Sequence, residues 1–501
     1  MKRGREEMEK TDVLIAGLGP VGAALGVYLA RSGVKVTVVE KTDEVYPMPR
    51  AAHLDHETMR LLDLAGGAEA VAGNSQPLSS YEFRNAKGDL LLGFRPRAAL
   101  ADTGWPYTSM FHQPTLEIAL REALSAEPSA SVRLGVSLVG YTDGPDGVTA
   151  EIEGPDGKTQ IAARYLVGCD GGQSTVRRLA GIGLDDMGFD EPWLVIDTLL
   201  KNGTTRLSTI GLQHCDPARP VTSMPMAPGR HRWEFMLLEG ETPEEVMTDE
   251  AIDAMIAPFA DPKSLSVERR AVYRFHAVFA ERWRDGHVIL AGDAAHQMPP
   301  FMGQGLCSGA RDAANLGWKL AAVIKGEADQ ALLDSFQPER EPHVRDITEM
   351  AVSMGRIVCT QDEAEAAARD AGMMQKPEAE RFDATPTLRG MASGVIEGGG
   401  AVAPSLVGKA GERPDRALGM SPFLVVAKRA DAPADKGGMQ IVALDEHEGE
   451  GVEPFFALMG DAPAMLVRPD RYVFGTGEPA SLLTAWAAYL KTGRAGMQAA
   501  A

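Results

Sequence analysis

The glycine-rich turn Gly17-Leu-Gly-Pro-Val-Gly22 constrains the fold more than any other part of this chain. It follows an apolar run over 11–17 and precedes a helical apolar pattern over 21–32. A second apolar run over 35–40 predicts another buried strand. Strand, turn, helix and strand in this order predict a βαβ unit within an α/β fold.

Each glycine of the turn has its own physical role in such a unit. Gly17 permits the tight turn, Gly19 lets the backbone approach a pyrophosphate, and Gly22 lets the helix pack closely on the strand. The helix N-terminus offers free N–H groups to the phosphates, and Glu40 can accept hydrogen bonds from a ribose diol. The turn therefore predicts a dinucleotide site but does not distinguish NAD from FAD. Further contacts are expected from Pro20, Val21 and Lys41.

Length and charge narrow the class of protein. A chain of 501 residues exceeds one ordinary core, so we expect two or three domains. The formal net charge of -20 argues against nucleic acid as a partner. The charged residues 1–10 predict a flexible tail rather than a secretory signal, and no window is apolar enough for a membrane span. The four cysteines form no CxxC pair, which argues against a disulfide framework or metal site and favours the cytoplasm; they are Cys169, Cys215, Cys307 and Cys359.

Short β-rich runs broken by Pro and Gly fill the stretch 193–238 and predict an antiparallel sheet inserted into the α/β framework. Hairpins are expected at 81–94 and 148–167, each around a glycine turn. A buried strand at 287–291 leads through a Gly/Pro-rich loop into a long helix over 308–324.

Two further motifs resemble those of the flavoprotein aromatic hydroxylases, and the resemblance extends over about residues 11–350. Arg164–Arg178, with Asp170-Gly171 at its centre, resembles the DG motif, and Gly286–His296 resembles the GD motif, whose aspartate is Asp293 here. The segment Pro299–Leu320 is similar to the loop and helix of that family that face the flavin. The α/β framework is therefore expected to be a Rossmann-like FAD-binding domain.

The resemblance implies a set of FAD contacts beyond the glycine turn. Physically, a glycine-rich loop that opens a long helix directs N–H donors at the flavin, where negative charge accumulates on reduction. Cys307 stands where the family often has asparagine. The implied contacts are Arg50, Gln113, Asp170, Asp293, Pro300, Gly303, Gly305, Leu306 and Cys307.

The stretches 215–220 and 232–241 look most like the 3-(3-hydroxyphenyl)propionate hydroxylase branch of the family. The segment 464–473 resembles the thioredoxin-like C-terminal domain of the phenol-hydroxylase branch, here without cysteines, so we assign it a packing or dimer-contact role and consider a homodimer. The domains expected are an FAD-binding domain (11–78, 108–190 and 280–360), a substrate-binding sheet domain (79–107 and 191–279), a connector (361–400) and a thioredoxin-like domain (401–495).

The activity that the resemblance implies is that of a monooxygenase. NADH or NADPH reduces the FAD, O2 then forms a flavin C4a-hydroperoxide, and a small phenolic aromatic substrate is hydroxylated ortho to an existing hydroxyl. His53 is the candidate base for the phenol, one residue beyond the histidine of biphenyl-type relatives, and Tyr107 is a candidate partner of the phenol. His296 is assigned a structural role in its loop.

Substrate contacts are expected from the inserted sheet and from the flavin loop. Met224, Met226 and Phe235 would come from the sheet, and Pro299 and Phe301 from the loop; the methionines are equally suited to an ordinary core. Arg206 or Arg232 could hold a substrate carboxylate by a bidentate pair. The alternatives are a polyketide or antibiotic hydroxylase of the same fold, a flavin oxidoreductase without oxygen insertion, and a non-catalytic flavin-binding protein.

Overall fold

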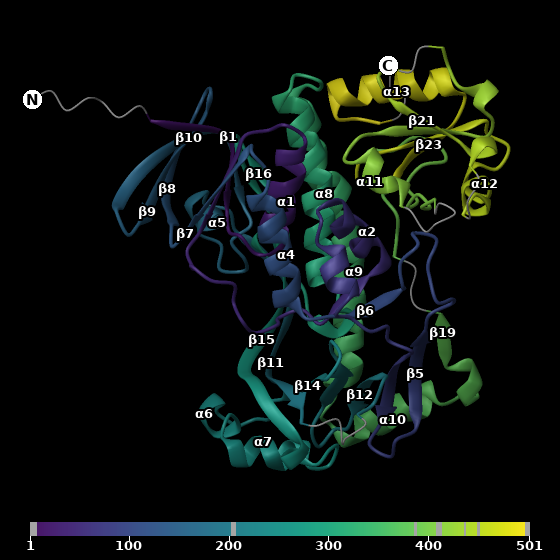
Figure 1. Cartoon of the computed structure of the whole chain (residues 1–501). Helices are drawn as coiled ribbons and strands as arrows, with labels where there is room; N and C mark the ends of the chain where they lie inside the picture. The colour runs from purple at the N-terminus through teal and green to yellow at the C-terminus, as the bar shows by residue number, and fades with distance from the viewer. Residues whose placement is uncertain are drawn as a thin grey trace, which may run out of the picture.

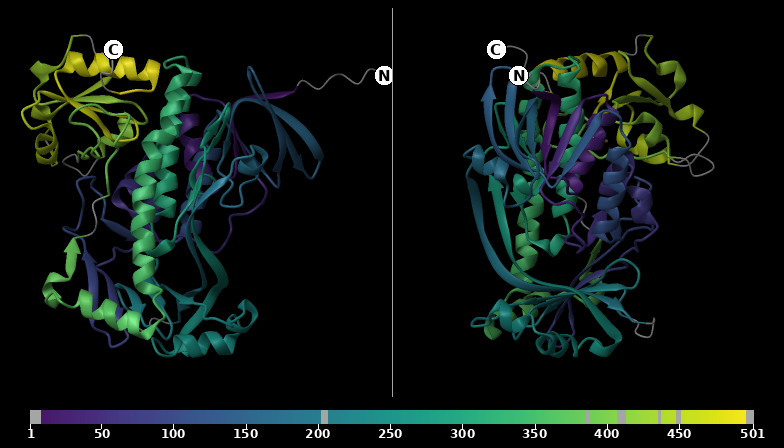
Figure 2. Two further views of the ribbon diagram at one scale, coloured as in Figure 1. Left: turned by 180° about the vertical axis from the view of Figure 1, so that it is seen from behind. Right: turned by 60° about the vertical axis from the view of Figure 1, so that its left-hand side comes forward.

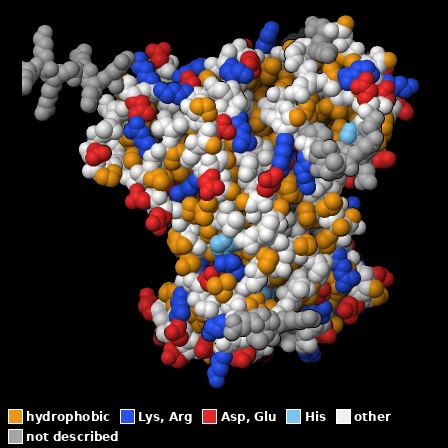
Figure 3. Space-filling view, viewed as in Figure 1, with side chains coloured by type: hydrophobic (Ala, Val, Ile, Leu, Met, Phe, Trp, Pro, Cys, Tyr) orange, Lys and Arg blue, Asp and Glu red, His pale blue; other side chains and the backbone are white. Residues whose placement is uncertain are grey.

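Three large β-sheets, a two-stranded ribbon and two long helices make up most of the described part of the chain in the computed structural model (Figure 1). The residues that it describes are 8–201, 207–384, 388–406, 413–434, 437–447 and 451–495. In these ranges no helix is long and apolar enough to cross a membrane. Figure 3 shows acidic and basic side chains interspersed over one face rather than gathered by sign.

The first sheet contains the predicted βαβ unit and has eight strands. Its path runs β16-β17-β10-β1-β2-β7, and β8 and β9 join it beside β10. The pairs β1–β10, β1–β2, β2–β7 and β10–β17 are parallel, as a doubly wound sheet requires. The strands are β1 (Glu9–Ala16), β2 (Val36–Glu40), β7 (Ala130–Leu134), β8 (Ser137–Gly144), β9 (Gly147–Gly154), β10 (Gly157–Gly168), β16 (Arg284–Asp285) and β17 (Val288–Leu290).

The helices on and beside this sheet bury most of their apolar side chains. The longest are α8 (Gly305–Ile324) and α9 (Phe336–Val358), which run side by side along the molecule in both views of Figure 2. In α8 every residue from 307 to 323 is buried, including four polar or charged side chains that find partners inside the protein, namely Arg311, Asp312, Asn315 and Lys319. The others are α1 (Pro20–Arg31), α2 (His56–Leu64), α3 (Ala68–Ala72), α4 (Gln113–Ser125) and α5 (Thr175–Leu179).

The second sheet has nine strands in the order β18-β15-β11-β14-β13-β12-β4-β5-β19. Its long strands β11 (Leu184–Leu200) and β15 (Leu265–Ala280) pair over most of their length and connect it to the first sheet. Helices α6 (Pro243–Val246) and α7 (Asp249–Ile256) lie at its far end (Figure 1). The other strands are β4 (Tyr81–Asn85), β5 (Leu90–Arg95), β12 (Gly211–Cys215), β13 (Val221–Pro225), β14 (Arg230–Met236), β18 (His296–Gln297) and β19 (Phe382–Ala384). A separate two-stranded ribbon pairs β3 (His53–Asp55) with β6 (Thr108–Met110).

Three expectations about these boundaries were wrong. Glu9 and Lys10 belong to β1, so the predicted tail 1–10 is too long; residues 1–7 lie outside the described ranges. The second sheet is not wholly antiparallel, because β12 pairs with β4 and β19 with β5 in parallel. The predicted connector 361–400 contains α10 (Glu363–Met373) and β19, which extends this sheet.

The C-terminal part forms a four-stranded sheet in the order β21-β20-β22-β23. Strands β20 (Phe423–Val426) and β21 (Gln440–Ala443) are parallel, whereas β22 (Ala464–Val467) and β23 (Val473–Gly477) run antiparallel to their neighbours. Helices α11 (Pro414–Leu418), α12 (Glu453–Met459) and α13 (Pro479–Thr492) accompany it.

A fully buried ion network joins this C-terminal sheet to α8 and α9. Glu339 of α9 accepts from Lys319 of α8 and from Arg468, at 2.7 Å each. Asp470 pairs with Arg468 at 2.8 Å and also accepts from Asn315. Burial alone would raise the pKa of Glu339, but the two cations outweigh it and lower that pKa to about 2. The network therefore holds two parts of the chain together through charges that have lost their water.

We expect Glu339→Gln to destabilise the protein by about 3–5 kcal/mol, because two buried cations would lose their shared carboxylate. Urea denaturation measures the loss. The control is Glu327→Gln, which removes the exposed pair with Lys325 and is expected to change stability by less than about 0.5 kcal/mol. Equal effects of the two substitutions would contradict this account of the interface.

Candidate active site

A cavity of about 1100 Å³ opens between the eight-stranded first sheet and the nine-stranded second sheet. The glycine turn after β1 lines one part of it, and residues of β4, β13, β14 and β15 line another. Its volume exceeds the roughly 300–1,000 Å³ of pockets for one small ligand. The cavity therefore has room for a large ligand and a second, smaller one.

The glycine turn has the backbone geometry that the sequence predicts. Gly17 has φ +102°, and a Cβ there would lie 2.4 Å from the carbonyl oxygen of Cys169. Gly22 lies behind the cavity wall, where a Cβ would be 2.1 Å from the carbonyl oxygen of Gly17. Its role is therefore packing, as expected, and not a ligand contact. Gly19 faces open space, and the wall also includes Pro20 and Val21.

Three predicted carboxylates lie on the cavity wall but differ in their partners. Glu40 accepts from the backbone N–H of Leu18 at 2.8 Å and so holds the turn in place. Asp170 accepts from Ser174 and from two backbone N–H groups at the start of α5, which fixes the DG segment. Asp293 makes no hydrogen bond or ion pair within the described ranges, and the residue is exposed on the cavity wall. Asp293 is therefore the carboxylate left to bind a ligand.

The loop before α8 forms the next part of the wall. Pro300, Gly303, Gly305 and Leu306 line the cavity, and α8 begins at Gly305. The side chain of Cys307 does not line the cavity: its thiol is fully buried, 3.8 Å from the carbonyl oxygen of His53. One residue of helical rotation separates Leu306 on the wall from this interior position.

The loop at Arg50 is held by two buried side chains. The side-chain oxygen of Gln113 accepts from the backbone N–H groups of Arg50 and Ala51 at 2.9 and 2.7 Å. Arg232 donates to the carbonyl oxygens of Pro49 and Arg50 at 2.7 and 2.8 Å. Arg50, Gln113 and Lys41 all lie on the cavity wall.

Arg232 was predicted to hold a substrate carboxylate, but most of its N–H groups donate to other parts of the protein. Its Nε and Nη2 atoms form a bidentate pair with Asp197 at 2.6 and 2.9 Å, in addition to the two carbonyl contacts. Four of its five N–H groups are therefore already donated. Asp197 also pairs with Arg269 at 3.3 Å. Arg206, the alternative, lies outside the described residues.

The two predicted catalytic side chains both line the cavity. The Nδ1 atom of His53 lies 3.2 Å from the carbonyl oxygen of Gly303. A carbonyl can only accept, so Nδ1 carries the proton and Nε2 is left as an acceptor. Burial lowers the pKa of His53 and favours the neutral ring. Tyr107 packs edge-on against His56, with ring centroids 5.4 Å apart.

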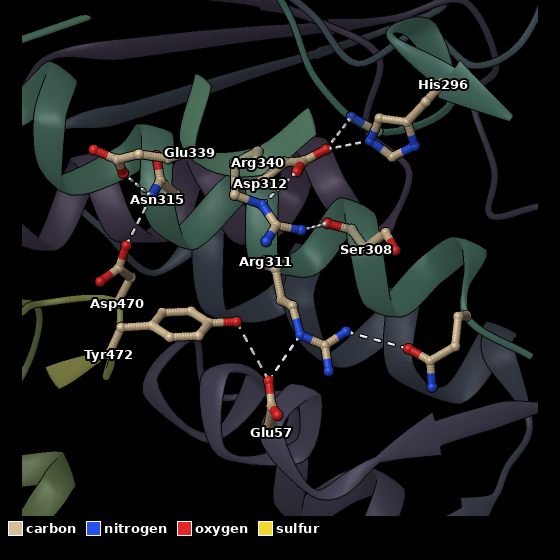
Figure 4. A network of polar contacts seen from close by, with 12 residues as sticks. Glu57, His296, Ser308, Arg311, Asp312, Asn315, Glu339, Arg340, Asp470 and Tyr472 are labelled. Carbon is tan, nitrogen blue, oxygen red and sulfur yellow. Dashed lines mark hydrogen bonds and ion pairs between the residues drawn. The ribbon is translucent and has the colours of Figure 1, made fainter. Parts of the chain in front are cut away.

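Neighbouring residues of α8 fix two parts of the wall from behind (Figure 4). Arg311 donates to Glu57 at 2.9 Å. It also donates to Asp55 at 2.6 Å, which anchors the strand that carries His53. Although burial opposes it, the Arg311 cation holds the pKa of Asp55 well below its usual range. Asp312 accepts from His296 at 2.6 Å and from the backbone N–H of Gly292. This geometry agrees with the structural role expected of His296.

Among the predicted substrate contacts, Met224 and Phe301 line the cavity. Phe235 does not, because it lies on the opposite face of β14 and packs near Phe259, with ring centroids 6.2 Å apart. Met226 is buried away from the wall, and Pro299 is off it although Pro300 is on it. For Phe235 the alternation of side chains along β14 decides the face, whereas Met226 lies just after the end of β13 and Pro299 just before a short 3-10 helix.

Several wall residues were missed by sequence reasoning. They are Met110, Met302, Glu234 and, from the predicted connector and the segment after it, Leu388 and Val402. A glutamate between Trp233 and Phe235 in an apolar strand is a signal that could have identified Glu234. In the described parts of the chain no group of His, Cys, Asp or Glu could hold a metal ion.

Comparison with known proteins assigns the family. The FAD binding domain family matches residues 10–351. The probable NADH-specific resorcinol 4-hydroxylase of Rhodococcus jostii (strain RHA1) is 37% identical over 94% of this chain and 93% of that protein. The 3-(3-hydroxy-phenyl)propionate/3-hydroxycinnamic acid hydroxylase of Mycolicibacterium smegmatis is 38% identical over 72% of this chain; the match spans 63% of that relative, less than two thirds.

Solved structures give the same fold. A ternary complex of aklavinone-11 hydroxylase with FAD and aklavinone has a TM-score of 0.77 at 27% identity, covering 97% of this chain and 99% of that one. The p-nitrophenol 4-monooxygenase of Pseudomonas putida has a TM-score of 0.67 at 26% identity, covering 75% and 96%. The chain therefore belongs to the FAD-dependent aromatic hydroxylase family.

Substitutions at two glycines with positive φ separate the steric effect of a new Cβ from its conformational cost. Gly17→Ala places a methyl group against the Cys169 carbonyl, so we expect less than a tenth of the wild-type flavin content. Gly33→Ala is the control, since Gly33 also has a positive φ but open space around it. It costs about 1–2 kcal/mol of stability and leaves flavin content unchanged. The ratio of absorbance at 450 nm to absorbance at 280 nm measures the flavin content of both variants. Full flavin content in Gly17→Ala would refute the assignment of the glycine turn to flavin binding.

Proposed function

We propose that this protein hydroxylates an aromatic compound ortho to an existing phenolic hydroxyl, with FAD, NADH and O2. The observation that carries the proposal is the imidazole of His53, held by its contact with Gly303 on the wall of the same cavity as the glycine turn and the loop before α8. The names of the relatives support both the phenolic substrate and NADH as electron donor.

The cavity wall offers the groups that an FAD molecule requires. The turn at Gly17 and Gly19 would hold the pyrophosphate at the N-terminus of α1, and Glu40 the ribose. Asp293, which has no partner within the described ranges, would accept from the ribityl hydroxyls. The chemistry that FAD supplies when bound is two-electron reduction by a nicotinamide and activation of dioxygen.

His53 would take part in the reaction as a proton acceptor. Its Nδ1–H donates to Gly303, which orients the ring and leaves the Nε2 lone pair available to a phenolic hydroxyl. Partial removal of the phenolic proton makes the ring electron-rich at the ortho carbon, which is the carbon to be oxygenated. The anchor formed by Arg311 and Asp55 would keep this ring in position during turnover.

An aromatic and methionine-rich wall would receive the substrate ring and exclude water. Phe301 packs edge-on against Trp193 and Phe275, with ring centroids 5.7 and 6.1 Å apart. Met224 of β13 and Met110 of β6 also line this cavity. A dry pocket strengthens the hydrogen bond between phenol and imidazole and limits wasteful oxidation of the reduced cofactor.

The C-terminal sheet is proposed to be a thioredoxin-like domain with a packing role. Its strand order and the direction of each pair support this, as do the absence of cysteine from residues 401–495 and the buried network to α8 and α9. A dimer-contact role, and with it a homodimer, remains part of the proposal and is tested by sedimentation.

The function is tested by adding small phenols to the purified holoenzyme with NADH or NADPH. We expect phenol-stimulated oxidation of NADH and an ortho-dihydroxylated product identified by mass spectrometry. Multi-ring polyketide substrates form a second arm, because the aklavinone hydroxylase covers almost the whole chain. NADH oxidation that yields only hydrogen peroxide with every compound would reject the hydroxylase activity.

His53→Gln is expected to lower kcat by about 10²–10⁴-fold, the usual contribution of a general base. Because burial lowers the pKa of His53, the wild-type kcat/KM should rise through a pKa below 6.5 and then stay level. This acid limb should disappear in the variant, since glutamine does not titrate. His112→Gln is the control, because His112 bonds to Thr115 outside the cavity. An unchanged pH profile in His53→Gln would remove His53 from the mechanism.

A further inference from the structure

Glu234 is a buried carboxylate on the cavity wall to which no described residue donates a hydrogen bond. It lies in the middle of β14, 4% exposed, opposite Val195 on one side and Thr222 on the other. Alternation places Glu234 on the same face as Arg232, toward the cavity, whereas Trp233 and Phe235 pack on the opposite face.

The groups around Glu234 do not donate to it. Thr222 donates to the side-chain oxygen of Gln213 at 2.8 Å, and Gln213 donates in turn to the hydroxyl of Tyr81. The Nη1 atom of Arg232 is 3.8 Å from Glu234, beyond hydrogen-bond distance, and donates to Arg50 instead. Within the described ranges Glu234 therefore accepts no hydrogen bond, and burial raises its pKa. A buried carboxylate without a donor is costly unless a ligand completes it.

The cations that β14 and β15 contribute to the cavity wall already have carboxylate partners. Arg232 is committed to Asp197 and to the loop at Arg50. Arg274 and His276 both face Asp190, with distances of 2.7 and 3.4 Å, and their side chains are largely exposed. Arg50 and Arg97 also line the cavity, on the loops before β3 and after β5, and no described residue accepts a hydrogen bond from their guanidinium groups. On β14 itself the wall presents the carboxylate of Glu234 as an acceptor, and the neighbouring Arg232 is already committed to other partners.

We propose that Glu234 selects the substrate: it accepts a hydrogen bond from a second, uncharged donor on the aromatic ring, such as another hydroxyl, and it excludes aromatic acids. The proposal rests on the hydroxylase function proposed above and adds the class of substrate. It assigns the first hydroxyl to His53 and the second donor to Glu234, on separate elements of one cavity.

Electrostatics explains why an acid would be rejected. Two carboxylates cannot both stay ionised in a buried site unless a cation lies between them. A neutral donor of the same shape gains a charge-assisted hydrogen bond instead. Replacing a carboxylate on the substrate by a neutral donor of the same shape should therefore strengthen binding at Glu234 through the change in charge alone.

A matched pair of compounds tests this, namely 3-(3-hydroxyphenyl)propionate and its primary amide, which have almost the same shape and differ in charge. For the wild-type holoenzyme we expect kcat/KM to be at least tenfold higher with the amide. Glu234→Gln removes the negative charge, so this ratio should fall at least tenfold while flavin content stays unchanged. A carboxylate that is used as well as the amide by the wild type would overturn the proposal, whether or not the variant folds.

Glu82→Gln is the control variant. Glu82 is equally buried in the same sheet, but it lies off the cavity wall and is already paired with Ser80 and Arg84. Its ratio of amide to acid should equal that of the wild type, and an equal fall in both variants would also overturn the proposal.

The outcomes also separate this proposal from the function on which it rests. Dissociation constants of both compounds, measured from the change in flavin absorbance on binding, give the preference without turnover. Binding that favours the amide, with no hydroxylated product from any phenol, would reject the function but not the selectivity. Hydroxylation of acid and amide alike would reject the role of Glu234 and leave the function intact.

Discussion

The placement of helix α8 is the constraint on which the rest of the site depends. Two adjacent residues of this buried helix reach in different directions, Arg311 to the strand of His53 and Asp312 to the turn that carries Asp293. One rigid helix therefore positions both His53, the candidate base, and Asp293, the candidate ligand of the ribityl chain. Side chains that are fixed from behind in this way are preorganised, so no further free energy is needed to order them during the reaction.

Most buried charges of this protein act as scaffolding and not as ligands. Arg232 and Asp197 tie the loop at Arg50 to the nine-stranded sheet, and Glu339 ties the C-terminal sheet to the helices. Their hydrogen bonds are largely completed inside the protein. On the cavity wall, Asp293 and Glu234 differ because no described residue donates to them. This contrast between completed and incomplete carboxylates is what distinguishes binding groups from structural ones.

The C-terminal sheet contributes to this arrangement although it lies away from the glycine turn. The hydroxyl of Tyr472, just before β23, is 3.4 Å from Glu57, which also accepts from Arg311 (Figure 4). Val402 forms a β-bridge with Tyr472 and lines the cavity. The segment between the large sheet and the C-terminal sheet therefore forms part of the site as well as a link between domains.

The sequence by itself determined the βαβ unit, the order of the motifs and the hairpins, because these depend on local periodicity and on glycines such as Gly17 whose backbone no other residue adopts cheaply. Only the tertiary structure decided which polar side chains stay free. Arg232 and Glu234 are equivalent in the alternating pattern of β14. Asp197 and the carbonyl groups at 49–50 accept the hydrogen bonds of Arg232, whereas no described residue donates a hydrogen bond to Glu234. Those partners lie 35 or more residues away, on strands and loops whose register no local pattern encodes.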